Sequence, residues 1–189
     1  MGLFERWANW VFRIATGSER KRWLYTPVIV LIFSCCLAAF IIAAIVTDQW
    51  LHLVKVVFLP WTVIAGLVIL IPGVFLYIWT MIDFVKGSGT PAPVNPPVHL
   101  ITNRLYAYNR NPMVTGIYLC FFGVGLLIGS LSLIVFYTPL FIILMHFYLV
   151  KVEEKELELK FGQEYLDYKK RVPMYLPRWR HNTAGQTAK

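Results

Sequence analysis

The chain has 189 residues, of which 58% are hydrophobic and 15% charged, and its formal net charge is +8. This composition excludes an ordinary soluble domain. Its basic residues flank long apolar runs, so the expected partner is the anionic headgroup of a membrane lipid, and no nucleic acid is expected. The three cysteines, Cys35, Cys36 and Cys120, lack metal-ligand spacing, and we expect no metal site.

Residues 1–24 form the first predicted region, an N-terminal interfacial helix followed by a basic hinge. Apolar residues recur at helical spacing from Leu3 to Ile14, with Arg6 and Arg13 between them. This pattern predicts an amphipathic helix in the membrane interface. A helix packed against the rest of the protein fits the pattern equally well.

Residues 25–85 contain two predicted membrane helices. The run from Tyr25 to Thr47 has no charged side chain and is long enough to span a hydrocarbon core of about 30 Å. It is about twice as long as a signal-peptide core, so we expect it to stay in the mature protein. The run from Val56 to Ile82 is also uncharged and contains two prolines, which membrane helices tolerate. Two passes within this second run, giving five spans in total, are the alternative.

The remaining chain begins with a Pro- and Gly-rich loop at residues 86–99, which excludes regular structure. No Asp, Glu, Lys or Arg lies between Arg110 and Lys151, which predicts helices 3 and 4 with a turn at Gly129 and Ser130. Gly125 and Gly129 form a G-x-x-x-G pair that fits close helix contact or only the turn. Residues 152–171 predict a charged helix that leaves the membrane, and 179–189 a disordered tail.

The positive charges predict the topology. If both termini and the loop before Arg110 lie on one side, every Lys and Arg except Lys55 lies there too. The predicted fold is therefore an all-α polytopic membrane protein. It has about four transmembrane helices, an N-terminal amphipathic helix and a C-terminal cytoplasmic helix, with both termini in the cytoplasm.

Ionisable residues gather at the cytoplasmic ends of the spans, where they carry functional information. Arg110 precedes Asn111 and Pro112, which read as a helix N-cap and first-turn residue, and such a helix start attracts anions. Glu153 and Glu154 end the fourth span at the same expected depth. His146 lies two turns deeper, where we expect a buried imidazole. A purely structural role explains these residues as well: a positive-inside anchor, a solvated helix start and a core histidine.

Several motifs in this region resemble the isoprenylcysteine carboxyl methyltransferase family and its bacterial phospholipid-methyltransferase-like relatives. They are GTPAP (89–93), PPVHLI (96–101), LYAYNRNPMVTG (105–116), the Glu pair and FGQEYLDYKKRVPMYLPR (161–178). Residues 86–178 thus form a methyltransferase-like region. The resemblance implies a membrane enzyme that uses S-adenosylmethionine to methylate a lipophilic acceptor, which could be a prenylated carboxylate, a lipid or a similar small molecule. The bacterial relatives favour a prokaryotic cytoplasmic membrane.

The resemblance places Tyr106, Arg110, Asn111, Pro112, Glu153 and Glu154 on the family's motifs, and the roles that follow are our predictions for these residues and their neighbours. Arg110 and Glu153 are the predicted catalytic residues, with Arg110 orienting the acceptor. Arg104 and His146 are predicted to bind the acceptor. The predicted cofactor-binding residues are His99, Leu100, Tyr106, Asn111, Pro112 and Glu154. Two departures, Val114 where tyrosine is usual and Arg104 where glycine is common, imply a remodelled pocket or an altered activity.

Methyl transfer from a sulfonium needs alignment more than acid–base chemistry, because the cofactor already carries the leaving group. A carboxylate acceptor held by Arg110 needs no base. An amine acceptor must lose a proton first, which would give a glutamate or His146 that task. Two alternatives to a methyltransferase remain: a membrane reductase of related architecture that uses NADPH, and a non-catalytic membrane protein that keeps the fold.

Overall fold

The computed structural model describes residues 6, 13, 17–55, 60–86 and 99–175, and these residues form helices and no strands. The predicted all-α membrane fold is confirmed. The predicted N-terminal helix, most of the Pro-rich loop and the C-terminal tail lie outside the described residues, apart from Arg6 and Arg13, which are both helical.

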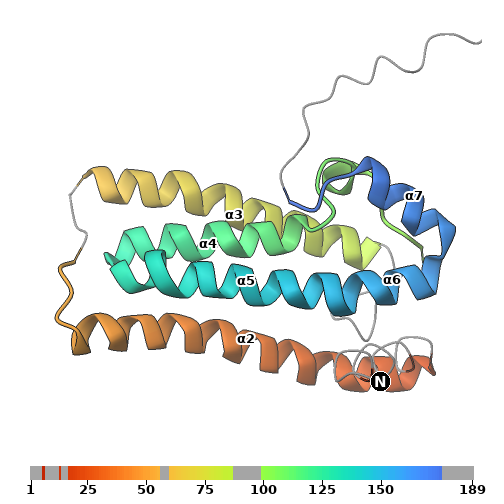
Figure 1. The fold of residues 1–189 in the computed structure, drawn as a ribbon, viewed down its shortest axis with the longest axis horizontal. Coiled ribbons are helices and arrows are strands. Elements are labelled where there is room, and N and C mark those ends of the chain that lie inside the picture. The colour runs from red at the N-terminus through yellow and green to blue at the C-terminus, as the bar shows by residue number, and fades with distance from the viewer. Residues whose placement is uncertain (1–5, 7–12, 14–16, 56–59, 87–98, 176–189) are drawn as a thin grey trace, which may run out of the picture.

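Four apolar helices run along the long axis of the molecule (Figure 1). They are α2 (Glu19–Trp50), α3 (Trp61–Lys86), α4 (Pro112–Ile128) and the continuous helix Leu133–Phe161. The last comprises the π-helical turn η2 (Leu133–Tyr137), α5 (Thr138–Tyr148), a second π-helical turn η3 (Leu149–Glu153) and α6 (Glu154–Phe161). Three of the four, α2, α3 and Leu133–Phe161, are long and apolar enough to cross a membrane.

The fourth apolar helix, α4, has 17 residues, about 25 Å at about 1.5 Å per residue. It ends at Gly129, whose φ of 68° is the left-handed conformation that glycine adopts without strain. Ser130 N–H then donates to the Gly125 carbonyl at 2.9 Å. The predicted turn at Gly129 and Ser130 is therefore present. The predicted second run is a single helix, because α3 continues through Pro72, so the five-span alternative is wrong.

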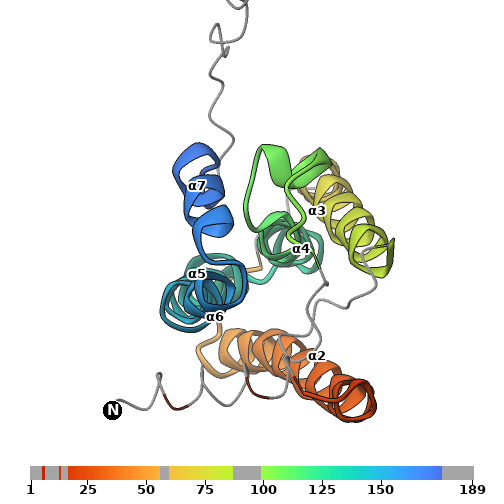
Figure 2. The ribbon, with the colours of Figure 1, turned by 90° about the vertical axis from the view of Figure 1, so that its right-hand side faces the viewer.

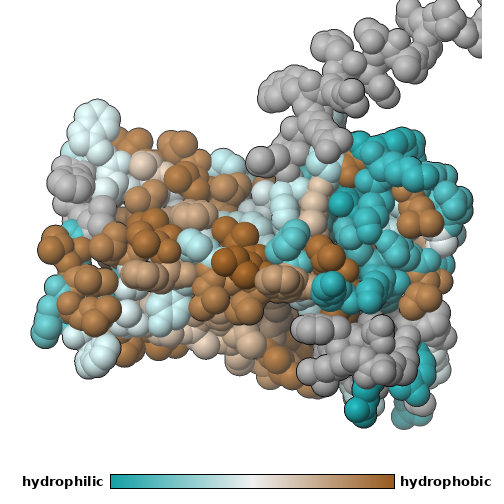
Figure 3. Space-filling model, viewed as in Figure 1, coloured by the Kyte–Doolittle hydropathy of each residue, from teal (hydrophilic) through white to brown (hydrophobic). Residues whose placement is uncertain are grey.

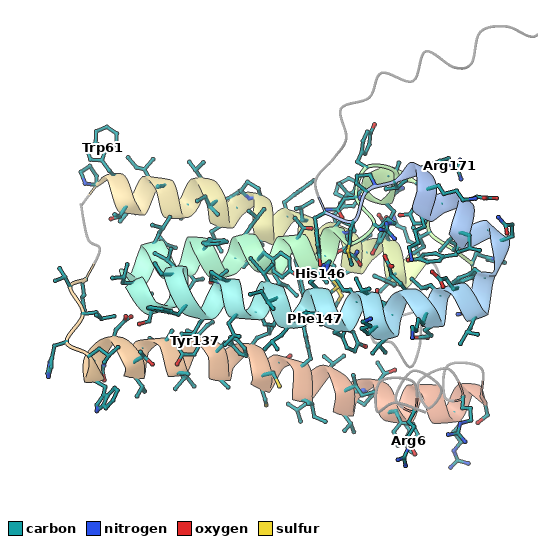
Figure 4. All side chains as sticks on the ribbon, in the orientation of Figure 1. Arg6, Trp61, Tyr137, His146, Phe147 and Arg171 are labelled. Carbon is teal, nitrogen blue, oxygen red and sulfur yellow. The ribbon has the colours of Figure 1, made fainter. Side chains whose placement is uncertain are left out.

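The end-on view in Figure 2 shows α4 between α3 and α5, with α2 beside them. Aromatic side chains join α2 to this group: the ring of Phe40 lies 5.4 Å from that of Phe141 and 6.1 Å from that of Tyr137. The Tyr137 hydroxyl is also 2.9 Å from Thr47 Oγ1, where η2 contacts α2 (Figure 4). The core therefore lies where α2, α4 and α5 meet.

Two pairs of glycines bring α3 and α4 together. A Cβ on Gly73 would lie 2.8 Å from the Gly116 carbonyl oxygen, and a Cβ on Gly116 would lie 2.7 Å from the Gly73 oxygen. Gly66 and Gly123 face each other in the same way one heptad away. This close backbone approach is typical of membrane helix pairs. The predicted G-x-x-x-G pair does not make it, since Gly125 packs against Ile134 across the turn.

We expect Gly73→Ala to lower the free energy of unfolding by about 1–3 kcal/mol, because the new methyl group meets backbone atoms that cannot move alone. Gly66→Ala is the matched control. There the nearest atoms belong to the flexible Leu127 side chain, at 2.9 Å, and the nearest backbone atom, the Gly123 carbonyl oxygen, is farther away at 3.1 Å, so the expected loss is smaller. Denaturation in detergent measures both variants, and an equal loss for the two would contradict rigid backbone packing at Gly73.

Most large apolar side chains of the helices face outward, as expected for a chain surrounded by lipid. Figure 3 shows hydrophobic residues along the helical part and hydrophilic residues gathered at the end that carries α6 and α7. The predicted charged helix over 152–171 is not continuous. Gly162, with a φ of 55°, ends α6, and α7 (Gln163–Arg171) turns back beside the loop before α4. This charged end holds the predicted site residues.

Candidate functional site

The segment before α4 places Arg110 at the helix start. The short 3-10 helix η1 (Arg104–Ala107) precedes it, and Asn111 and Pro112 occupy the N-cap and first-turn positions as predicted. The Asn111 side chain does not cap the helix. Its Nδ2 donates to the Met174 carbonyl at 3.3 Å, and its backbone N–H donates to Asn109 Oδ1 at 2.7 Å. Asn111 therefore ties the start of α4 to the chain that follows α7.

An ion-pair network joins this helix start to α6 and α7. Arg110 Nη1 pairs with Glu154 Oε1, and the other Glu154 oxygen accepts from Lys169 Nζ at 2.7 Å. Lys169 also pairs with Glu158, at 2.9 Å. The side chains of Arg110 and Glu154 are only 11% and 8% exposed. The start of α4 and the end of the fourth span thus meet in a buried ion pair. The sequence predicted that Arg110 and Glu154 lie at the same depth in the membrane.

Glu153 lies beside this network but takes no part in it. It is half-buried, and within the described part of the chain no hydrogen bond or ion pair involves its carboxylate. Its charge reaches two tyrosines. Burial is the main cause that raises the pKa of Tyr106 and of Tyr175, and the negative charge of Glu153 adds to both shifts. Glu153 is therefore an acceptor with free capacity, close to two aromatic side chains.

Three further polar atoms in this part of the molecule are buried and lack a hydrogen-bond partner among the described residues: Arg110 Nε, Glu156 Oε1 and Asp83 Oδ2. Glu156 and Asp83 are 2% and 6% exposed. Unsatisfied buried polar groups are costly, so they favour a bound group that satisfies them. The two oxygens need a donor or a cation, and the guanidinium N–H needs an acceptor.

Arg104 occupies the position where the resemblance leads us to expect glycine. The backbone conformation at this position explains why glycine is common there. Its φ is 52°, the left-handed conformation that glycine adopts most easily. Two contacts of the side chain compensate this strain: Nη1 pairs with Asp83 at 2.8 Å, and the guanidinium lies 5.9 Å from the Trp79 ring centroid. Arg104 therefore fastens η1 to the end of α3.

His146 differs from its prediction. It is exposed rather than buried, and its Nδ1 lies 3.2 Å from the hydroxyl of Tyr175. Figure 4 shows it on α5, away from the end that carries α7. The π-helical turn Leu149–Glu153 explains why the prediction failed. A π-helix has more residues per turn than an α-helix, so His146 and Glu153, seven residues apart, no longer lie on the same helix face.

The remaining predicted residues lie around the network. Tyr106 is buried and Pro112 fully buried, whereas His99 is exposed. Leu100 packs beneath α7 against Tyr165, Tyr168 and Val172. The structure thus brings Arg110, Asn111, Pro112, Glu153 and Glu154 together with Tyr106, and it leaves His99 and His146 at the margins.

The helix α7 covers the network with two tyrosines that the sequence reasoning did not single out. Tyr165 and Tyr168 are 2% and 3% exposed, and burial raises the pKa of both hydroxyls. Burial would lower the pKa of Lys169, but the bonds to Glu154 and Glu158 outweigh it and raise that pKa. The i, i+3 spacing of the two tyrosines, with Val172 four residues further on, was a usable signal for one buried helix face.

We expect Tyr168→Phe to lower the free energy of unfolding by about 1–2 kcal/mol, because a buried carbonyl loses its donor. The Tyr168 hydroxyl donates to the Tyr106 carbonyl oxygen at 2.7 Å. Denaturation in detergent measures the change, with the exposed Tyr108→Phe as control. A loss no larger than that of the control would show that α7 is held without this bond.

The phospholipid methyltransferase family matches residues 61–164, more than half of the chain. The protein-S-isoprenylcysteine O-methyltransferases of Mus musculus and Rattus norvegicus are each 36% identical to it over 80 residues. This match covers 41% of the chain and 27% of each relative, so the chain spans only part of these relatives. No solved structure matches the chain significantly. The matched region contains α3, η1, α4 and the helix with both glutamates.

Proposed function

Because the chain belongs to the phospholipid methyltransferase family, we propose that it transfers a methyl group from S-adenosylmethionine to a lipophilic acceptor at the membrane. The observation that carries the proposal is the buried pair of Arg110 and Glu154 with the unpartnered Glu153 beside it. The isoprenylcysteine methyltransferases named above support an acceptor that carries an isoprenyl or similar lipophilic group.

The unsatisfied atoms fit this cofactor. S-adenosylmethionine carries an ammonium and a sulfonium, which need anions or acceptors, and a carboxylate, which needs a donor. Glu153 and the free oxygens of Glu156 and Asp83 supply acceptors, and Arg110 Nε supplies a donor. When bound, the cofactor supplies an electrophilic methyl group and its own leaving group.

The residues of the chain then have separable tasks. Glu154 is already held by Arg110 and Lys169, so we assign Glu153 to the cationic part of the cofactor. Tyr106 and Pro112, with Asn111, Leu100 and His99, form the wall around it, and α7 excludes water. Arg110 orients the acceptor at the network, and Arg104 and His146, at the margin of the site, contact the rest of the acceptor. A carboxylate acceptor needs no base, whereas an amine acceptor would give Glu153 or His146 that task.

Cofactor binding and methyl transfer test this function. Purified protein is titrated with S-adenosylhomocysteine and with NADPH, and is then incubated with lipid extract and cofactor carrying a labelled methyl group. Saturable binding of S-adenosylhomocysteine and a labelled lipophilic product are expected. Binding of NADPH alone would contradict the methyltransferase proposal and favour a membrane reductase. Binding of neither would leave a non-catalytic protein with the same fold.

The proposed site belongs on the cytoplasmic side, because α6 and α7 together carry five basic residues and Lys55 lies at the other end. We expect a cysteine at Lys170 to react with an impermeant maleimide only after the cytoplasmic face is opened. A cysteine at Lys55, in the same cysteine-free background, should react in intact cells. The reverse pattern of labelling would invert the topology.

A further inference from the structure

A half-open cavity of about 590 Å³ lies at the end of the helices opposite the candidate site. It is formed where α2 ends and where α4 turns into η2. Its apolar wall comes from Ile45, Leu53 and Ile128, and its polar lining from Asp48, Gln49, His52, Lys55 and Ser130. A volume of this size is in the range of small-ligand sites.

The acidic group of the cavity is already engaged. One oxygen of Asp48 accepts from the Ser130 hydroxyl, and the other accepts from the Ser132 backbone N–H at 2.9 Å. The side chains of Gln49, His52 and Lys55 are exposed, and within the described part of the chain none has a hydrogen bond or ion pair. Each of these three side chains can donate a hydrogen bond, and Lys55 adds a positive charge, so together they suit an anion.

The backbone at His52 forms an ordered helix end rather than a frayed one. Its φ is 49°, a left-handed conformation that is uncommon for residues other than glycine. Its N–H donates to the Gln49 carbonyl at 3.3 Å, and the next N–H, of Leu53, donates to the Asp48 carbonyl at 2.9 Å. These bonds fix the backbone of His52 and Leu53 at the edge of the cavity.

The depth of the cavity indicates what kind of anion it meets. Trp50 ends α2 and Trp61 begins α3, and they are 79% and 72% exposed. Figure 4 shows Trp61 at this end of the molecule. Exposed tryptophans at the ends of membrane helices lie at the level of the lipid headgroups. An apolar wall next to a cationic rim at this depth matches a phospholipid, whose phosphate adjoins its acyl chains.

We propose that this cavity binds the phosphate headgroup of a phospholipid in the leaflet opposite the candidate site. Lys55 and His52 hold the phosphate, while Ile45 and Ile128 contact the start of an acyl chain. The lipid would bridge the end of α2 to the turn between α4 and α5, which Asp48 already links. This inference does not depend on the proposed methyl transfer.

Native mass spectrometry of the full chain in detergent, with added phosphatidylglycerol, tests the proposal. Lys55→Gln should weaken lipid binding about fivefold. Lys55→Gln with His52→Asn, which tolerates the left-handed backbone, should weaken it further. Lys86→Gln, an exposed lysine at the other end of α3, is the matched control and should change nothing. Equal binding by the Lys55 and Lys86 variants would overturn the proposal.

Two further measurements separate a lipid in this cavity from a lipid bound elsewhere on the protein and from a simple anion. Ile128→Trp fills the apolar wall without changing charge and should also reduce lipid binding, with the melting temperature showing that the fold is retained. Lipid binding unaffected by Ile128→Trp would overturn the placement in this cavity. Excess inorganic phosphate should not displace the lipid, because it lacks the apolar part. Full displacement of the lipid by phosphate would show that the cavity is a site for simple anions and not for a phospholipid.

Discussion

Replacing Glu153 by glutamine is expected to weaken the binding of S-adenosylhomocysteine about 10- to 100-fold, because the ligand's ammonium loses one charged hydrogen bond. The fold should barely change. Glu153 makes no ion pair among the described residues, so its neutralisation leaves no buried partner behind. Calorimetric titration measures the affinity, and the melting temperature in detergent measures the stability.

Glu164→Gln is the matched control, since Glu164 is an exposed carboxylate on α7. It should bind the ligand as the unmodified protein does. Unchanged binding by Glu153→Gln would remove Glu153 from the cofactor site. A large fall in its melting temperature would assign it a structural role instead.

The membrane fold could be predicted because long stretches without charge mark each span, whatever packs against them. The contact of Arg110 with Glu154 was also within reach, since both residues end apolar runs at one membrane surface. The sequence could not predict which of the two adjacent glutamates faces Arg110. Neighbours on a helix point about 100° apart, and the π-helical turn before Glu154 shifts the phase of that face.

Other features depend on the pairing of distant segments, which one sequence does not specify. Gly73 and Gly116 bring α3 and α4 together only because the two helices meet in one register. The break at Gly162 separates two segments that both favour helix, and only the positive φ reveals that α7 turns back. Asp83 gave a weak signal as the first charge after an uncharged run, but its pairing with Arg104 required the fold.

The charges of Arg110 and Glu154 are expected to contribute unequally to stability, because their other partners differ. Glu154→Leu leaves the buried Arg110 guanidinium, among the described side chains, with only the Tyr165 hydroxyl at 3.5 Å. It should lower the free energy of unfolding by about 3–5 kcal/mol. Arg110→Met leaves Glu154 still paired with Lys169 at 2.7 Å. Its cost should therefore be clearly smaller.

The double variant separates this asymmetry from simple loss of packing. With both charges replaced by apolar side chains of similar volume, no buried charge of the pair is left alone, and Lys169 keeps Glu158 at 2.9 Å. The double variant should then be more stable than Glu154→Leu, because removing Arg110 relieves the stranded charge. Denaturant unfolding in detergent gives all three values. Equal costs for the single variants, with additive loss in the double, would mean that Arg110 and Glu154 do not form an energetically coupled pair.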